Sequence, residues 1–213
     1  MNVTRGITFP RRPVMGWFRR HPKPDPEQDR RAWWVHAVDT YAALAAGRQP
    51  ASWEPEDLRF TSPVFLDASV EFACFYGLDV VEPDPVWCLV PPNILGALTC
   101  SLLARAQADR NWQRAVERAA PQWRDHAPAR VLVTEDATWV LVHGAWQAYP
   151  HAAIVDYRLD GDAAVFTAAG SAPRALAGPA AWAHAVLLAY LHPALPDWQA
   201  APWLAPIRDA TRP

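Results

Sequence analysis

The sequence predicts an α+β fold, in which a bent antiparallel sheet is closed by a C-terminal helix and two additional helices pack on it. Between residues 130 and 177 apolar and polar residues alternate over several short runs, which is the period of half-buried strands. Segments 27–46 and 94–120 repeat apolar residues at helical spacing, and a third apolar segment covers 180–191. With 51% hydrophobic and 20% charged residues among 213, the chain is suited to one packed domain.

The two early helices have recognisable ends. Pro26 suits the first turn of the helix over 27–46, and Gly47 suits its end. Asn93 is a favourable N-cap for the helix over 94–120, which Pro121 ends. Its charged residues indicate a solvated face first and a binding face second. We expect its apolar face to consist of Leu95, Leu98, Leu102, Ala106, Ala115 and Ala119.

Short strands fill most of the remaining chain. Residues 70–76 alternate in part, as in a half-buried strand, and the run 86–90 is fully apolar between two prolines. Asp160-Gly161 is a strong signal for a two-residue hairpin. The strands of the meander are expected over 130–134, 138–143, 145–149, 154–159, 163–168 and 174–176.

Residues 129–191 resemble the bacterial pleckstrin-homology-like (PH-like) modules. The first matching features are an apolar strand ending in threonine at 131–134, the next strand at 139–143 and a tryptophan at 146. They are followed by a hairpin strand that ends in Asp-Gly at 154–161 and by a small-residue turn into a helix at 178–191. The preceding stretch 119–125 is also similar. The resemblance implies a PH-like meander over 130–177 within a single domain, residues 28–195. Related sequences carry a basic pair where this chain has Glu135-Asp136, which argues against phosphoinositide-style binding at that loop.

The first 27 residues are predicted to form an extended Pro/Arg-rich arm. Five prolines between Pro10 and Pro26 disfavour a helix there. Residues 1–31 hold eight basic and three acidic side chains, whereas the other residues are acidic in balance. The arm therefore suits contact with an acidic partner, a membrane surface or nucleic acid, or packing of its aromatics on its own acidic domain. Its candidate binding residues are Trp17, Phe18, Arg19 and Arg20.

A second candidate binding surface is an aromatic face of the meander. Alternation places Trp139, Leu141 and His143 on one side of a strand, and Trp146 follows on the next strand. Such a face suits a peptide or another subunit, because tryptophan is enriched at interfaces. The favoured interpretation is that the helix carrying Trp33 and Trp34 covers it, because large exposed apolar patches are uncommon in monomers.

Catalytic and metal-binding motifs are not recognisable in the sequence. The three cysteines, Cys74, Cys88 and Cys100, have neither disulfide-framework nor zinc spacing and lie in apolar stretches. There is no nucleophile elbow and no phosphate-binding glycine loop. No catalytic residue, metal site or cofactor is therefore predicted. A cytoplasmic location is expected, since neither a signal peptide nor a membrane-spanning run is visible.

These features predict a non-enzymatic cytoplasmic interaction module that binds a protein partner or itself, as a scaffold, adaptor or immunity protein does. Peripheral membrane contact through the arm is left open, and no strong nucleic-acid signal is present. The alternative is a small hydrolase or transferase with a site assembled from scattered His, Asp and Cys. A pocket in which His143 or His151 meets a carboxylate would favour the enzyme. Residues 196–213 are expected to form a loose tail that docks through Trp198 and Trp203.

Overall fold

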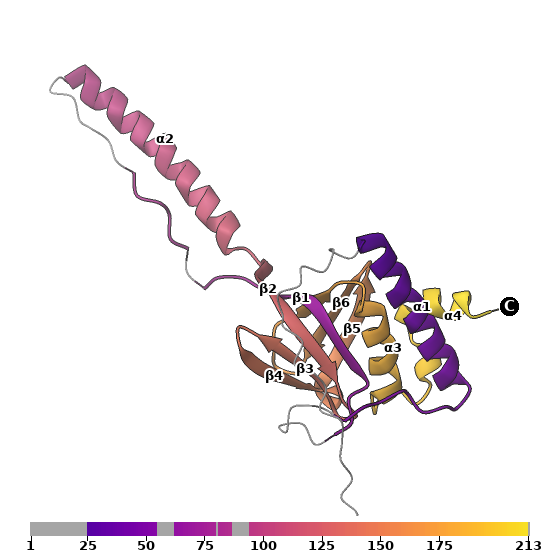
Figure 1. Ribbon diagram of the computed structural model, residues 1–213. Helices are drawn as coiled ribbons and strands as arrows, with labels where there is room; N and C mark the ends of the chain where they lie inside the picture. Colours follow the sequence, from indigo (N-terminus) through magenta and orange to yellow (C-terminus); the bar gives the residue numbers. More distant parts are fainter. Residues whose placement is uncertain (1–24, 55–61, 80, 87–93, 213) are drawn as a thin grey trace, which may run out of the picture.

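The computed structural model describes residues 25–54, 62–79, 81–86 and 94–212 (Figure 1). In these residues seven strands and four α-helices are present, so the predicted α+β class is confirmed. The strands are β1 (Leu66–Tyr76), β2 (Gln122–Val133), β3 (Ala137–Val142), β4 (Ala145–Pro150), β5 (Ile154–Asp160), β6 (Ala163–Ala168) and β7 (Arg174–Ala177). The helices are α1 (Pro26–Ala45), α2 (Ile94–Ala119), α3 (Ala181–Leu191) and α4 (Ala205–Ala210).

The seven strands form one curled antiparallel sheet in the order β4-β3-β2-β1-β7-β6-β5 (Figure 1). The strands β1 to β4 form one meander, the strands β5 to β7 form another, and β1 joins them by pairing with both β2 and β7. The pairing of β1 with β2 extends from Leu66↔Val133 to Tyr76↔Gln122, interrupted by a bulge after Phe72. Both strands are longer than the sequence predicted, whereas the other predicted strands of the meander agree within two residues.

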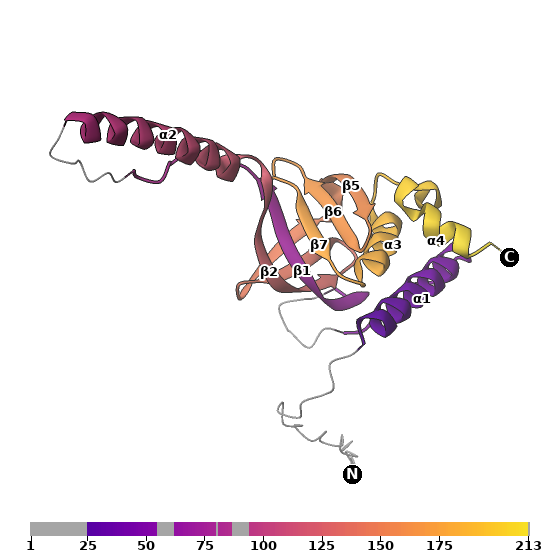
Figure 2. The same ribbon diagram turned by 90° about the horizontal axis from the view of Figure 1, so that it is seen from above.

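The core lies between the inner face of the sheet and α3. Alternation places Val131, Val140 and Phe166 on that face, and none of them has any exposed surface. Helix α3 is buried almost all round, because the sheet lies on one side of it and α1 and the C-terminal segment lie on the other (Figure 2). Its many alanines leave room for neighbours on every side, and close packing of this kind is the main source of stability.

Helix α1 packs on α3 and α4, whereas the sequence predicted that it packs on the sheet. The ring of Trp34 meets that of Trp182 edge to face at 4.9 Å, and Tyr41 meets Trp198 at 5.2 Å. Such aromatic pairs add to the stabilisation from burial. The side chain of Asp25 accepts a hydrogen bond from the Glu27 N–H and caps the helix. Asp25 and Pro26, which the sequence analysis assigned to the arm, therefore belong to the start of this helix.

Helix α2 stands away from the sheet at the far end of the β1–β2 pair, as Figures 1 and 2 both show. The expectation that it packs on the domain is wrong. Its buried face, with Asn111, Ala115 and Ala119, meets the chain segment that follows β1: the Asn111 amide donates to the carbonyl of Asp84, and Arg118 forms an ion pair with Asp84. This segment, and not the sheet, covers the alanine face. Of the strand predicted over 86–90, residues 87–90 lie outside the described residues.

Replacing residues 77–121 by an Asn-Gly turn is expected to leave the domain folded. Tyr76 pairs with Gln122, so a two-residue turn of this type can close the β1–β2 hairpin directly. Since α2 buries its alanine face on the removed segment, the melting temperature followed by circular dichroism should change by no more than about 4 °C. Loss of cooperative unfolding in this variant would mean that α2 supports the core.

The C-terminal residues belong to the core and are not the loose tail that the sequence suggested. After α3 the chain forms two short 3₁₀ turns and α4. Trp198 is buried, as its expected docking requires, but Leu204 and Ile207 have no exposed surface at all. They pack in the same cluster as α1 and α3. The burial of Leu204 and Ile207 shows that this segment helps to form the core, although its many prolines and alanines are typical of a loose tail.

Candidate functional site

The predicted aromatic face exists on the outer side of the sheet. Leu132 pairs with Trp139 across β2 and β3, and Leu141 pairs with Trp146 across β3 and β4, so both tryptophans lie on the same side. They are half-buried against Leu132 and Val64. Helix α1 packs on α3 and α4, so the expectation that its Trp33 and Trp34 cover this face is wrong.

His143 does not belong to that face. It is the first residue of the two-residue turn between β3 and β4, with φ +50°, and Gly144 follows with φ +78°. Two consecutive residues with positive φ make the tight turn that fits the twist of a hairpin. Because Gly144 marks the turn and such a turn needs two residues, the strand must end at Val142 and not at His143. The side chain of His143 is exposed.

The other four predicted binding residues, Trp17, Phe18, Arg19 and Arg20, lie outside the described residues. Their role in binding stays a prediction.

Helix α2 also carries exposed apolar side chains that were not expected from the sequence, and they do not share one face. Leu103 and Trp112 are nine residues, or about two and a half turns, apart, so they lie on opposite sides of the helix. Leu103 is 66% exposed, Trp112 53% and Val116 45%. Trp112 and Val116 are four residues apart, so they are neighbours on the helix surface. Only alanines and leucines were expected on the apolar face of this helix, although the i, i+4 pair is visible in the sequence. Arg105, Arg110 and Arg114 are exposed on the same helix, together with Asp109 and Glu117.

A buried polar chain joins β3, β5 and α3 on the inner side of the sheet. The Thr138 hydroxyl lies 3.1 Å from His184 Nε2 and 3.4 Å from His151 Nε2, and the Tyr157 hydroxyl lies 3.2 Å from His184 Nδ1. We assign Tyr157 as donor to His184, His184 as donor to Thr138, and Thr138 as donor to His151. This assignment gives each of these protons an acceptor. It also fixes the ring orientations that hold α3 on the sheet.

The two histidines of this buried hydrogen-bond network, His151 and His184, are neutral at pH 7. Burial lowers the pKa of His151 to about 4, against the opposing effects of the Glu135 backbone and the Asp136 charge. Burial, with the neighbouring His151, lowers the pKa of His184 to about 3. Among the described residues no hydrogen bond joins His143 or His151 to a carboxylate. A pocket in which His143 or His151 meets a carboxylate, which would favour a hydrolase or transferase, is therefore not present in the described residues.

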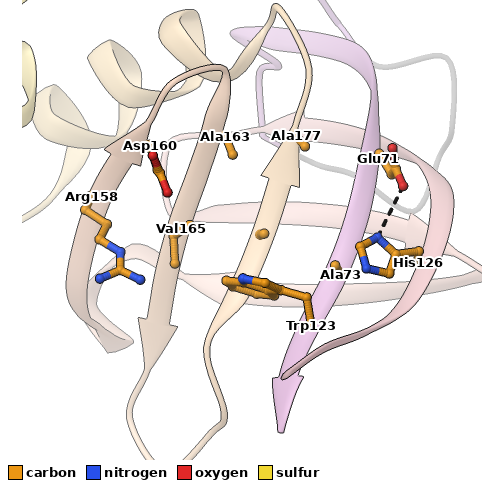
Figure 3. Close-up of a pocket in the computed structure, with 10 residues that line it drawn as sticks. Glu71, Ala73, Trp123, His126, Arg158, Asp160, Ala163, Val165 and Ala177 are labelled. Atoms are coloured by element: carbon orange, nitrogen blue, oxygen red, sulfur yellow. Dashed lines mark hydrogen bonds and ion pairs between the residues drawn. The ribbon is translucent and has the colours of Figure 1, made fainter. Parts of the chain in front are cut away.

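The opposite, outer side of the sheet has a hollow of about 230 Å³ (Figure 3). Its floor is formed by small side chains from three adjacent strands, including Ala73, Ala163 and Ala175. Trp123 forms one wall and packs edge to face on Phe75 at 5.3 Å. The rim carries the pair His126–Glu71, with 3.2 Å between Nδ1 and Oε1, and also Arg158 and Asp160. Acidic and basic groups are thus mixed around a floor that accepts a small apolar group.

Comparisons with known proteins give no family for this chain. No protein-family model matches it, and neither a curated protein nor a solved structure matches it significantly. In the part of the chain that the structure describes, no helix is both long and apolar enough to cross a lipid bilayer. Within the same residues, no three His, Cys, Asp or Glu side chains are grouped so as to hold a metal ion.

Proposed function

We propose that the protein is a non-enzymatic, cytoplasmic interaction module, of scaffold, adaptor or immunity type, that binds a protein partner through α2. The observation that carries this proposal is the position of α2: a 26-residue helix that stands off the domain and exposes Trp112, Val116 and Leu103. Tryptophan and arginine are the residues most enriched at interface hot spots. A helix that presents both, outside the domain it is anchored to, suits insertion into a partner's groove.

The proposed module is a PH-like fold whose bent sheet is closed by α3. The strand order, with a four-strand and a three-strand meander joined through β1 and β7, is compatible with this fold. In support of closure, α3 contacts β1, β5 and β6 on the inner side of the sheet, and its His184 reaches Thr138 of β3. In this arrangement α2 is an insertion between the first two strands of the sheet.

Replacing Trp112 and Val116 together by alanine is expected to lower partner recovery at least about tenfold, since hot-spot truncations cost 2 kcal/mol or more. The measurement is quantitative mass spectrometry after affinity purification of the full chain from its own cells. Gln113→Ala/Glu117→Ala is the matched control, because both residues are exposed on the same helix and alanine favours helix in both variants.

Three results separate the interpretations. A protein recovered with the wild type and the control, but lost with Trp112→Ala/Val116→Ala, supports the proposal. Equal recovery with all three chains contradicts it. Sedimentation of the purified chain at several concentrations shows whether the partner is a second copy, in which case the double variant should sediment as a monomer.

A further inference from the structure

Strand β5 is an edge strand of the sheet and lies beside an apolar groove. Among the strands that the structure describes, its single neighbour is β6. The groove has a volume of about 480 Å³ and is lined by the consecutive residues 154–157 together with Leu188, Leu195 and Trp203. Consecutive residues of a strand point to opposite faces of the sheet. A groove that contacts all four residues 154–157 therefore runs along the edge of β5 and not over one of its faces. Val155 on this edge is 69% exposed. Asp156, Arg158 and Asp160 are exposed on the same strand, so the apolar lining of the groove comes mainly from Ile154, Val155, Tyr157 and the residues after β7.

The chain enters α1 close to the carboxyl end of this strand. Arg30, in the first turns of α1, forms an ion pair of 2.7 Å with Asp162, the second residue of the β5–β6 turn. Figure 1 shows the start of α1 at this end of the sheet. Residues 1–24 precede Asp25, so whatever they contact must be reached from this point.

Residues 14–20 match the β5 edge in length and chemistry. They are free of proline between Pro13 and Pro22, and they number seven, as β5 does. Residues 21–24 link them to Asp25, and four extended residues reach at most about 14 Å. The segment is thereby restricted to the neighbourhood of α1's start. Val14, Met15, Trp17 and Phe18 are apolar, whereas Arg19 and Arg20 come last, nearest the link.

The direction of the chain brings complementary groups together. If residues 14–20 run parallel to β5, with their end at the carboxyl end of that strand, the two arginines lie beside Asp160. The apolar residues of the segment then lie along the groove that is lined by Ile154 and Tyr157. Residues 1–24 contain six basic and no acidic side chains, and opposite charges favour this register over the reverse one.

We propose that the β5 edge is a peptide-docking groove and that its occupant is the chain's own segment 14–20, added as an extra strand. Backbone hydrogen bonds to the free edge give such an added strand its affinity, and side chains in the groove give it specificity. His192 Nε2 donates to the Ile154 carbonyl at 2.9 Å, which fixes the start of the edge. The groove is distinct from α2, so this inference does not rest on the proposed function.

Hydrogen exchange of the full-length chain tests the docking. Amides on a free edge exchange rapidly, and pairing with an added strand slows them. In the variant Trp17→Ser/Phe18→Ser, the amides among residues 154–160 that point away from β6 should exchange at least about tenfold faster than in the wild type, whereas those bonded to β6 should not change. The matched control is Val3→Ser/Phe9→Ser, which changes apolar residues of the arm outside the segment and should leave β5 protected. Equal exchange of β5 in all three chains would overturn the proposal.

A photo-crosslink gives the location independently of stability. p-Benzoylphenylalanine placed at position 155 in the full-length chain should link to residues 14–20 of the same molecule, read by peptide mass spectrometry. Links to other segments alone, or no link, would contradict the docking. Links between two molecules, lost on dilution together with the protection of β5, would show that the arm of a second copy occupies the groove, and the intramolecular proposal would be wrong.

Discussion

Replacing Leu204 and Ile207 by alanine is expected to destabilise the domain severely. Both side chains are fully buried in the main cluster. Large-to-alanine changes at such positions cost about 2–5 kcal/mol each. The total free energy of unfolding of a domain is only about 5–15 kcal/mol. The double variant should therefore be largely unfolded or melt at a much lower temperature, and each single variant should show about half the loss in urea denaturation.

The control for this experiment is Asp209→Ala, on the same helix but exposed. Its change in stability should stay within about 0.5 kcal/mol, as for most surface substitutions. If Leu204→Ala and Ile207→Ala behave like this control, residues 196–213 are a dispensable tail after all. The full-length chain should be used throughout, because the neighbouring Trp198 packs on Tyr41 and belongs to the same cluster.

Lowering the pH from 7 to 4.5 is expected to destabilise the fold more steeply than its exposed groups would predict. In the unfolded chain the histidines titrate near pH 6.5. In the folded chain burial lowers the pKa of His151 to about 4 and that of His184 to about 3. Between these pKa values the unfolded state binds more protons than the folded state. The free energy of unfolding therefore decreases as the pH is lowered, by about 1.4 kcal/mol per pH unit for each histidine. Above pH 7 both states are neutral at these groups, and the effect ends.

The measurement is the free energy of unfolding in urea at half-unit steps of pH. His184→Gln removes one titrating group and should lower the slope by about 1.4 kcal/mol per pH unit, whatever it does to stability at pH 7. His143→Gln changes an exposed histidine at the β3–β4 turn and should leave the slope unchanged. An unaltered slope in His184→Gln would mean that His184 is accessible to protons in the folded protein.

Local patterns in the sequence were sufficient for the elements themselves. Strand alternation reports which face of a strand is apolar, and the meander from β3 to β7 was predicted nearly to the residue because its hairpins are short and their turn residues are explicit, as at Asp160-Gly161. The error at His143 was also local: the residue preceding Gly144 forms half of the turn. Trp139 and Leu141 were correctly placed on one face by strand alternation, and the pairing of Leu141 with Trp146 brings the second tryptophan to that face.

What covers each apolar face was decided only by the tertiary structure. Periodicity shows that a helix has a face to bury, but it contains no information about the neighbour that buries it. For α2 that neighbour is the segment around Asp84, and for Trp139 it is Val64 and not α1. For α3 it includes Leu204 and Ile207, which lie beyond several prolines. The burial that lowers the pKa of His184 arises in the same way. These contacts join residues far apart in the chain, and their free energy depends on the whole assembled core rather than on any local run of residues.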